Sequence, residues 1–218
     1  MATVIAVSGR AEVRIEPELG AVSLTVGSSG GDREPLLRDV AEAHERLLED
    51  VRELEASGVL DTWSAGQLRV WSHRPWNAEG RQLPLVHQAN ADVEVVFSDL
   101  SALGGWLGRV TGAPHLTLGG IEWRLTDATR DRVLEEAQRA AVADAVRKAA
   151  VYAEALGLGA PVAIELADSG MLTTPQPMPR PHQAVMMRAM ALDGAPEAEI
   201  APAKLVMEAS VDARFHAD

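Results

Sequence analysis

The sequence predicts an α+β fold in which a largely antiparallel β-sheet is packed by two long helices and one short helix. Segments with the two-residue alternation of strands and segments with helical spacing follow one another without strict β-α-β order, which favours antiparallel pairing. The 218 residues are 47% hydrophobic, which is enough for a packed core without covalent staples. We therefore expect one domain over residues 1–218, with 171–202 as a long loop or arm.

The N-terminal part is expected to form two strands and a long helix. Residues 3–16 and 19–29 are rich in Val, Ile, Leu and Thr, and a short proline-containing turn joins them. Leucine and valine then recur at helical spacing from Leu36 to Leu54, and Gly58 ends this helix.

A third strand is expected near residues 64–74, followed by a loop that contains Pro, Asn and Gly. The fourth strand, at residues 85–97, has the clearest alternation in the chain. Its polar face carries Gln, Asn, Asp and Glu side chains, so we expect one buried and one solvated face. The predicted buried face consists of Leu85, His87, Ala89, Ala91, Val93, Val95 and Phe97.

Two more helices and a fifth strand are expected in the next segment. Residues 100–110 keep helical spacing in spite of three glycines, residues 116–125 form the strand, and the longest helix begins at Asp127 and ends at Gly157. The inner face of this helix is mostly alanine, so the helix must lie close to whatever it covers. The predicted face consists of Val133, Leu134, Ala137, Ala141, Ala145, Ala149, Tyr152 and Leu156.

The last part of the chain contains two strands separated by an irregular segment. Residues 161–167 are expected to form a sixth strand, and the alternation over 205–215 predicts a strand that returns to the sheet. Residues 171–202 include six prolines and several methionines and show no sustained period, which predicts the long loop or arm.

Charge and composition disfavour several classes of function. The 20 Lys+Arg and 32 Asp+Glu give a formal net charge of −12, which disfavours binding to nucleic-acid phosphates and to anionic membranes. The absence of cysteine excludes disulfides, iron–sulfur clusters and Cys-ligated zinc. The N-terminal segment lacks the features of a signal peptide, and no apolar run reaches the roughly 20 residues of a transmembrane helix. We therefore expect a cytoplasmic protein.

Four segments carry short motifs whose order spans nearly the whole chain. They are the hydrophobic strand with a Ser-Gly step at 4–9 and Ala-Glu-Val at 11–13, the leucine-rich helix end with Gly-Val at 54–59, the strand-to-helix junction at 118–127, and the Ala-x-x-Asp-Ala-x-x-Lys-Ala helix at 141–150. In these segments the chain resembles the SIMPL-domain family.

The resemblance implies an α+β protein but no reaction. The family is named after a mammalian signalling adaptor that associates with a Pelle-like kinase. Its bacterial members are mostly periplasmic proteins of uncertain role; some are linked to oxidative or envelope stress, and one forms a large hollow ring-like homo-oligomer. No catalytic residues come with the family. This sequence departs from the bacterial pattern because it lacks a signal peptide and carries Trp123 where Phe is usual, a conservative change of core packing.

Exposed aromatic residues form one candidate contact region. Trp71 and Trp76, with His73 between them, fall in or beside a loop, where aromatic side chains mark a protein interface or a ligand pocket. Burial in the protein's own core is the other common fate of tryptophan. Of the two exposed alternatives, we favour the interface. A pocket lined by Trp71, His73, Trp76 and His87 is the alternative.

A second candidate region lies in the arm, which has the most unusual local composition in the chain. Its thioether and imidazole side chains suit Cu(I), but flexible methionines also adapt to a neighbouring protein surface, and we favour this contact role. The residues concerned are Met171, Met178, His182, Met186, Met187 and Met190.

Carboxylates on the last long helix have two interpretations. They could hold a divalent cation or do acid–base work, but arginines interleave with them, which favours a solvated face of ion pairs. The residues are Asp127, Asp131, Glu135, Glu136 and Asp144.

No nucleophile motif, phosphate-binding glycine loop or local histidine pair appears in the sequence. We therefore predict no catalytic residue, no cofactor and no metal site. The predicted function is that of a non-enzymatic SIMPL-like protein that acts by self-assembly, by binding another protein, or both, with a homo-oligomer as the expected state. The alternative is a small-molecule or metal-binding stress protein with a pocket near Trp71, His73 and Trp76.

Overall fold

Antiparallel sheets and three helices confirm the predicted α+β class. The computed structural model describes residues 3–76, 82–172 and 202–218, whose strands form two sheets in two compact units. The first unit contains β1 (Thr3–Ile15), α3 (Asp127–Ala155), β7 (Val162–Asp168) and β8 (Leu205–Ala217). The strands before and after the expected turn, β1 and β2, do not pair with each other but enter different sheets.

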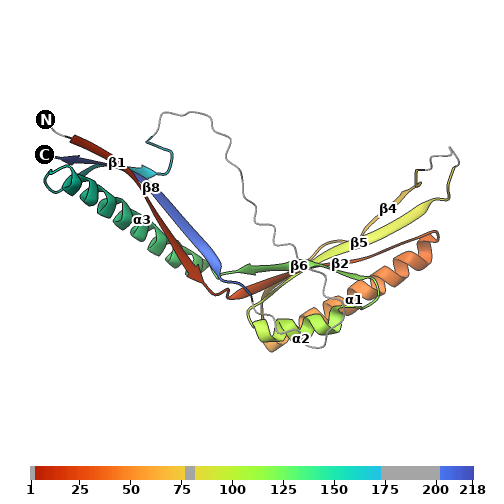
Figure 1. The fold of residues 1–218 in the computed structure, drawn as a ribbon. Helices are drawn as coiled ribbons and strands as arrows, with labels where there is room; N and C mark the ends of the chain where they lie inside the picture. Colours follow the sequence, from red (N-terminus) through yellow and green to blue (C-terminus); the bar gives the residue numbers. More distant parts are fainter. Residues whose placement is uncertain (1–2, 77–81, 173–201) are drawn as a thin grey trace. The chain divides into compact units, whose positions relative to one another are not determined.

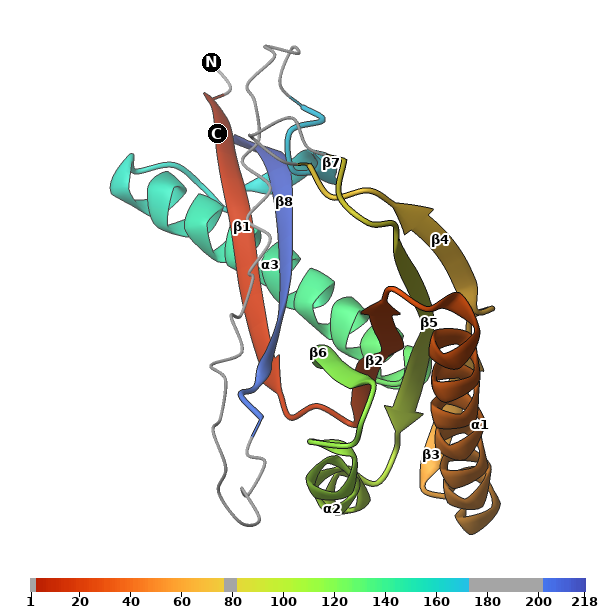
Figure 2. The same cartoon turned by 90° about the vertical axis from the view of Figure 1, so that its right-hand side faces the viewer.

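The first sheet has the strand order β1-β8-β7. β1 and β8 pair antiparallel from Thr3↔Ala217 to Ile15↔Leu205, and Figure 2 shows them side by side. The helix α3 packs against β1 and β8 on one face of this sheet (Figure 1). The C-terminal strand predicted from its alternation is confirmed, and its partners are the first and the seventh strands.

Small side chains determine how α3 packs. A row at four-residue spacing is buried, and it consists of Val133, Ala137, Ala141, Ala145, Ala149 and Ala153. The predicted alanine face is confirmed, but the inclusion of Leu134, Tyr152 and Leu156 was wrong, because these side chains are exposed. Tyr152 follows Ala149 by three residues and turns to the flank of the helix, whereas Ala153 continues the buried row.

The second sheet has the order β3-β5-β2-β6, and β4 also pairs with β5. The helices α1 and α2 pack against this sheet (Figure 1). The elements of this unit are β2 (Leu19–Gly30), α1 (Arg33–Ser57), β3 (Leu60–Ala65), β4 (Arg69–His73), β5 (Val86–Phe97), α2 (Leu100–Val110) and β6 (Leu116–Arg124). Gly58 ends α1 as predicted, in the left-handed conformation at φ 77° that glycine adopts without strain.

The single strand predicted at 64–74 was wrong, because this segment is two strands along the same partner. β3 pairs with the Val93–Phe97 part of β5, and β4 pairs with the Val86–Asn90 part. Between them, Gly66 donates its backbone N–H to the carbonyl of Asp92 at 2.7 Å. A Cβ on Gly66 would lie 3.2 Å from that carbonyl oxygen, so glycine suits this close approach to β5.

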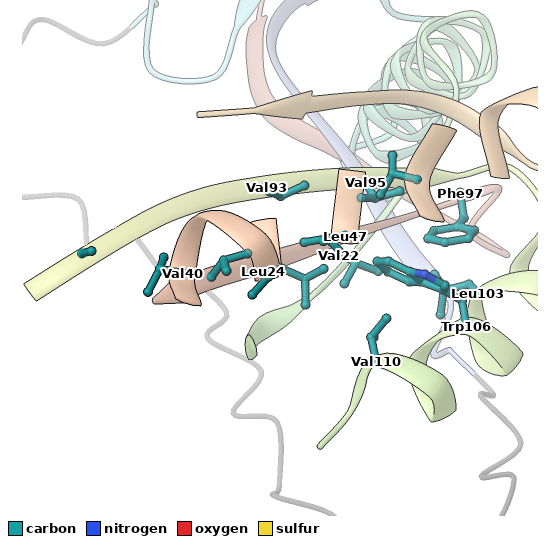
Figure 3. Packing of buried hydrophobic residues seen from close by; sticks show 14 of the residues in the cluster. Val22, Leu24, Val40, Leu47, Val93, Val95, Phe97, Leu103, Trp106 and Val110 are labelled. Carbon is teal, nitrogen blue, oxygen red and sulfur yellow. The ribbon is translucent and has the colours of Figure 1, made fainter. Parts of the chain in front are cut away.

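A tryptophan on α2 lies at the centre of the second core. The Trp106 side chain is fully buried, and its ring lies 5.1 Å from that of Phe97 in a tilted contact (Figure 3). The indole Nε1–H donates to the Asp50 carboxylate of α1 at 2.5 Å. Trp123, whose aromatic character the family resemblance predicted, also packs against this core. The buried face of β5 is confirmed from Ala89 to Phe97. The inclusion of Leu85 was wrong, because this residue precedes the strand and is 39% exposed, and His87 is only half-buried.

Candidate functional site

The Ala-x-x-Asp-Ala-x-x-Lys-Ala motif of α3 packs directly on the edge strand β1. Its alanines face Gly9, where a Cβ would lie 2.0 Å from the carbonyl oxygen of Ala141 and 2.8 Å from the Cβ of Ala145. Real Cβ atoms do not approach other atoms this closely, so only glycine fits at this position of the strand. The Ser-Gly step of the N-terminal motif and the alanines of the helical motif are therefore two halves of one contact.

The polar residues of the motif bind the backbone of β1. The Asp144 carboxylate accepts the backbone N–H of Arg10 at 3.0 Å and the Lys148 ammonium at 2.7 Å. Lys148 in turn donates to the carbonyl of Ser8 at 2.8 Å. These backbone groups lie on the edge of β1, where another strand would otherwise pair. Asp144 and Lys148 therefore close the middle of this edge.

These contacts lower the pKa of two carboxyl groups in the first unit. The hydrogen bond from Lys148 is the main cause for Asp144, followed by the Arg10 N–H, and both hold the pKa of its carboxyl well below the ordinary 3.8. The pKa of Asp212 on β8 is lowered as well, chiefly by the Ser8 hydroxyl at 2.6 Å and the Gly170 N–H at 2.7 Å. Both groups stabilise the fold as carboxylates.

We predict that the first unit loses stability in acid through Asp144 and Asp212. Their folded pKa lies below the unfolded value, so their contribution is fully present above about pH 5 and is lost as the pH falls through 4 toward the folded pKa. Urea unfolding of Asp144→Asn and Asp212→Asn is expected to depend less on pH between 5 and 3 than that of the parent. The exposed Asp168→Asn is the matched control. If the parent and all three variants had equal slopes, the assigned cause would be wrong.

The remaining carboxylates of α3 form the predicted ion-pair face. Arg130 lies 3.2 Å from Asp127 and 3.5 Å from Asp131, and Arg139 pairs with Glu135 at 2.5 Å. Among the described residues, no three His, Asp or Glu side chains gather as ligands for a metal ion. No helix in the described parts is both long and apolar enough to cross a membrane.

The aromatic candidate region lies on and beside β4. Trp71 is 43% exposed and Trp76, just after the strand, is 86% exposed, so neither tryptophan is part of the core. In the β4–β5 pairing, Trp71 lies opposite Gln88 and His73 opposite Val86. Alternation along the strand puts Trp71 and His73 on the same face of the hairpin.

The structure separates His87 from this pair. His87 lies opposite Ser72 in the ladder, and its Nδ1 is 2.6 Å from the Ser72 hydroxyl. Because Ser72 alternates with Trp71 and His73, His87 faces the other side of the sheet. The expected set of Trp71, His73, Trp76 and His87 therefore does not line a common face. The arm candidates Met178, His182, Met186, Met187 and Met190 lie outside the described residues.

Sequence reasoning missed an exposed apolar edge at β7. The strand was predicted, but only the topology makes it an edge, because β8 pairs with it on one side. Its aliphatic side chains are more than half exposed, with Val162 at 65%, Ile164 at 52% and Leu166 at 56%. Within the described residues, no side chain binds the outer backbone of β7 as Asp144 and Lys148 bind that of β1.

A cavity of about 480 Å³ lies in the second unit, between α1 and the segment that connects α2 to β6. Its α1 residues recur every three or four positions, which sequence reasoning cannot tell from an ordinary solvated helix face. The residues of the opposite wall are distant in sequence. The lining consists of Asp39, Glu42, Ala43, Arg46, Leu47 and Asp50 from α1, and Arg109, Val110, Ala113, Pro114, His115 and Leu116 from the opposite wall.

Comparison with known proteins identifies one family. The family model described as SIMPL, protein of unknown function (DUF541), matches residues 5–215, which include both units. No curated protein matches the chain. The matched range contains the Gly9 contact, the Asp144–Lys148 pair, the β7 edge and the cavity.

Proposed function

Because the chain belongs to the SIMPL family, whose function is unknown, we propose that it is a non-enzymatic protein that acts by self-association. The contrast between the two edges of the first sheet carries this proposal. The middle of the β1 edge is closed by side chains of α3, whereas among the described residues no side chain binds the outer backbone of β7, which presents three exposed aliphatic residues. An exposed apolar edge strand is a template for pairing with another chain, and β7 interrupts its regular register with β8 once, between Ala163 and Glu165.

A second copy of the same strand suits this edge. β7 has seven residues, and antiparallel pairing of two copies about a two-fold axis gives an isologous contact. The only charged residue within the apolar part of the strand is Glu165, and Arg214 pairs with it at 2.7 Å. Two copies would therefore not bring unpaired carboxylates together, which matters in a chain with a net charge of −12.

The β4–β5 hairpin provides a second surface for contacts between copies. Trp71 and Trp76 expose large aromatic surfaces, and a tryptophan side chain loses little conformational entropy when a contact orders it. Side chains of this kind contribute much of the binding energy of protein interfaces. With one surface at β7 and another at the hairpin, a subunit can join more than one neighbour, as a closed ring or larger assembly requires.

Native mass in solution tests the proposal. We expect light scattering coupled to size exclusion to give a multiple of the 23.2 kDa chain mass that persists on dilution. Ile164→Lys is expected to reduce the mass by placing a charge on the β7 edge, and Trp71→Ser with Trp76→Ser is expected to reduce it at the second surface. Ala6→Lys on β1 is the control that leaves the mass unchanged.

Two outcomes would contradict the proposal. The first is a parent protein that is monomeric at all concentrations, which would redirect attention to a different protein as the partner. The second is an Ile164→Lys variant with the parent mass, which would remove β7 from the contact. Circular dichroism of each variant shows that it is folded.

A further inference from the structure

We propose that the cavity between α1 and the α2–β6 connection binds a dipeptide with apolar side chains, a small zwitterion whose ammonium and carboxylate lie at opposite ends. The site belongs to the second unit and does not depend on the proposed self-association. Its volume of about 480 Å³ falls within the range of small-molecule sites. Three features of the lining carry the proposal: opposite charges on its two walls, an apolar floor and a rigid frame.

The α1 wall carries the carboxylates that would bind an ammonium group. Asp39 and Asp50 are partly buried there. Asp39 is paired with Arg38 at 3.2 Å and Glu42 with Arg46 at 3.6 Å, so Asp50 is the lining carboxylate that has no cationic partner among the described residues. The indole N–H of the fully buried Trp106 donates to Asp50 at 2.5 Å. Since Trp106 cannot move within the core, the Asp50 carboxylate is held in place before any ligand arrives.

The opposite wall carries the cation that would bind a carboxylate. Arg109 lies in the last turn of α2 and lines the cavity. In the part of the chain that the structure describes, its guanidinium has no ion-pair or hydrogen-bond partner, whereas Arg46 on α1 is paired. A guanidinium presents two parallel N–H donors that match a carboxylate.

Between the charged walls the floor is apolar and the frame is fixed. Leu47 and Val110 are buried members of the main core that also line the cavity, so an aliphatic side chain would replace water there. The backbone of His115 has a φ of 65°, which is uncommon for a residue other than glycine. Its carbonyl accepts the backbone N–H of Gly27 at 2.7 Å, which anchors this wall to β2.

Calorimetric titration with the dipeptide Leu-Leu tests the inference. We expect saturable binding to the parent protein, and at least tenfold weaker binding of N-acetyl-Leu-Leu, which lacks the ammonium, and of Leu-Leu-amide, which lacks the carboxylate. Each derivative removes one charge-assisted contact and keeps the apolar part.

Variants assign each charge of the dipeptide to its wall. Arg109→Gln is expected to weaken Leu-Leu binding at least tenfold, because the ligand carboxylate no longer has a partner. This variant should bind Leu-Leu and Leu-Leu-amide with equal affinity. Asp50→Asn keeps a hydrogen-bond acceptor for Trp106 but removes the negative charge. This variant is expected to bind Leu-Leu and N-acetyl-Leu-Leu with equal affinity. The exposed Arg52→Gln on α1 is the control and should bind like the parent.

Two results would overturn the inference. One is the absence of saturable binding of Leu-Leu at millimolar concentration to a folded parent protein. The other is equal Leu-Leu affinity of the parent and Arg109→Gln, which would place any dipeptide elsewhere. Both results are independent of native mass, so they are distinguishable from a failure of the self-association proposal.

Discussion

Replacement of Trp106 by alanine is expected to destabilise the second unit by about 3–5 kcal/mol, the range for removing a large aromatic side chain from a core. The ring is fully buried against Phe97, so the cavity left behind cannot fill without movement of α2. The substitution also leaves the half-buried Asp50 carboxylate without its indole donor, which adds a desolvation cost. Urea unfolding followed by far-ultraviolet circular dichroism measures the change.

Two further substitutions separate packing from hydrogen bonding at this position. Trp106→Phe keeps most of the ring volume but removes the N–H, so it is expected to cost about 1–3 kcal/mol. Trp76→Ala removes a side chain that is 86% exposed and is expected to change stability by less than about 0.5 kcal/mol. Equal losses for Trp106→Ala and Trp76→Ala would contradict the assignment of Trp106 to the core.

Replacement of Gly9 by alanine is expected to cost at least about 3 kcal/mol in the first unit, at the upper end for overpacked sites. The added methyl group would lie 2.0 Å from a backbone oxygen of α3, and a backbone atom within a helix cannot rotate away as a side chain can. The helix must therefore move off the sheet, which separates the alanine row from Ile5, Val211 and Phe215 in the same core.

The matched control for Gly9→Ala is Gly31→Ala. A Cβ at Gly31 meets nothing within 4 Å, so this change is expected to alter stability by less than about 1 kcal/mol. Thermal and urea unfolding of the two variants, side by side with the parent, give the comparison. A Gly9→Ala variant as stable as Gly31→Ala would show that α3 does not need its close approach to β1.

Local patterns in the sequence predicted the elements well. The spacing of small residues predicted α3 and most of its buried row, and the alternation over residues 85–97 predicted which face of β5 is buried. The boundary errors have local causes as well. The strand expected near residues 64–74 is interrupted after Ala65, and Gly66 begins the connection to β4 with its N–H bonded to the Asp92 carbonyl.

The candidate sites depend on contacts between distant residues, which one sequence does not show. Asp144 was grouped with the helical carboxylates, but its distinctive partner is the Arg10 backbone, 134 positions away. The β7 edge follows from the strand order, and local alternation cannot distinguish an edge strand from a central one. The cavity joins α1 to the segment after α2, and neither half carries a recognisable motif by itself.

The SIMPL motifs hold α3 on β1 and occupy part of one edge of the first sheet. Gly9, Asp144 and Lys148 act together to bring α3 onto β1 and to occupy its backbone edge. A sheet with one edge closed in this way can pair with a second copy through its other edge only. Copies therefore cannot add to both edges and extend the sheet without limit. The central claim of the proposed function is therefore that two copies pair through the β7 edge and not through the β1 edge.

Cross-linking of single cysteines tests this claim most directly, because the chain has no cysteine of its own. Ile164→Cys and Leu166→Cys are placed on the β7 edge, and Ala6→Cys on β1 is the matched control. If β7 pairs with a second copy, mild oxidation gives a disulfide-linked dimer of the β7 variants, in high yield at micromolar protein, while Ala6→Cys stays monomeric on a non-reducing gel. Equal yields from the two edges, or a dimer from Ala6→Cys alone, would contradict the account.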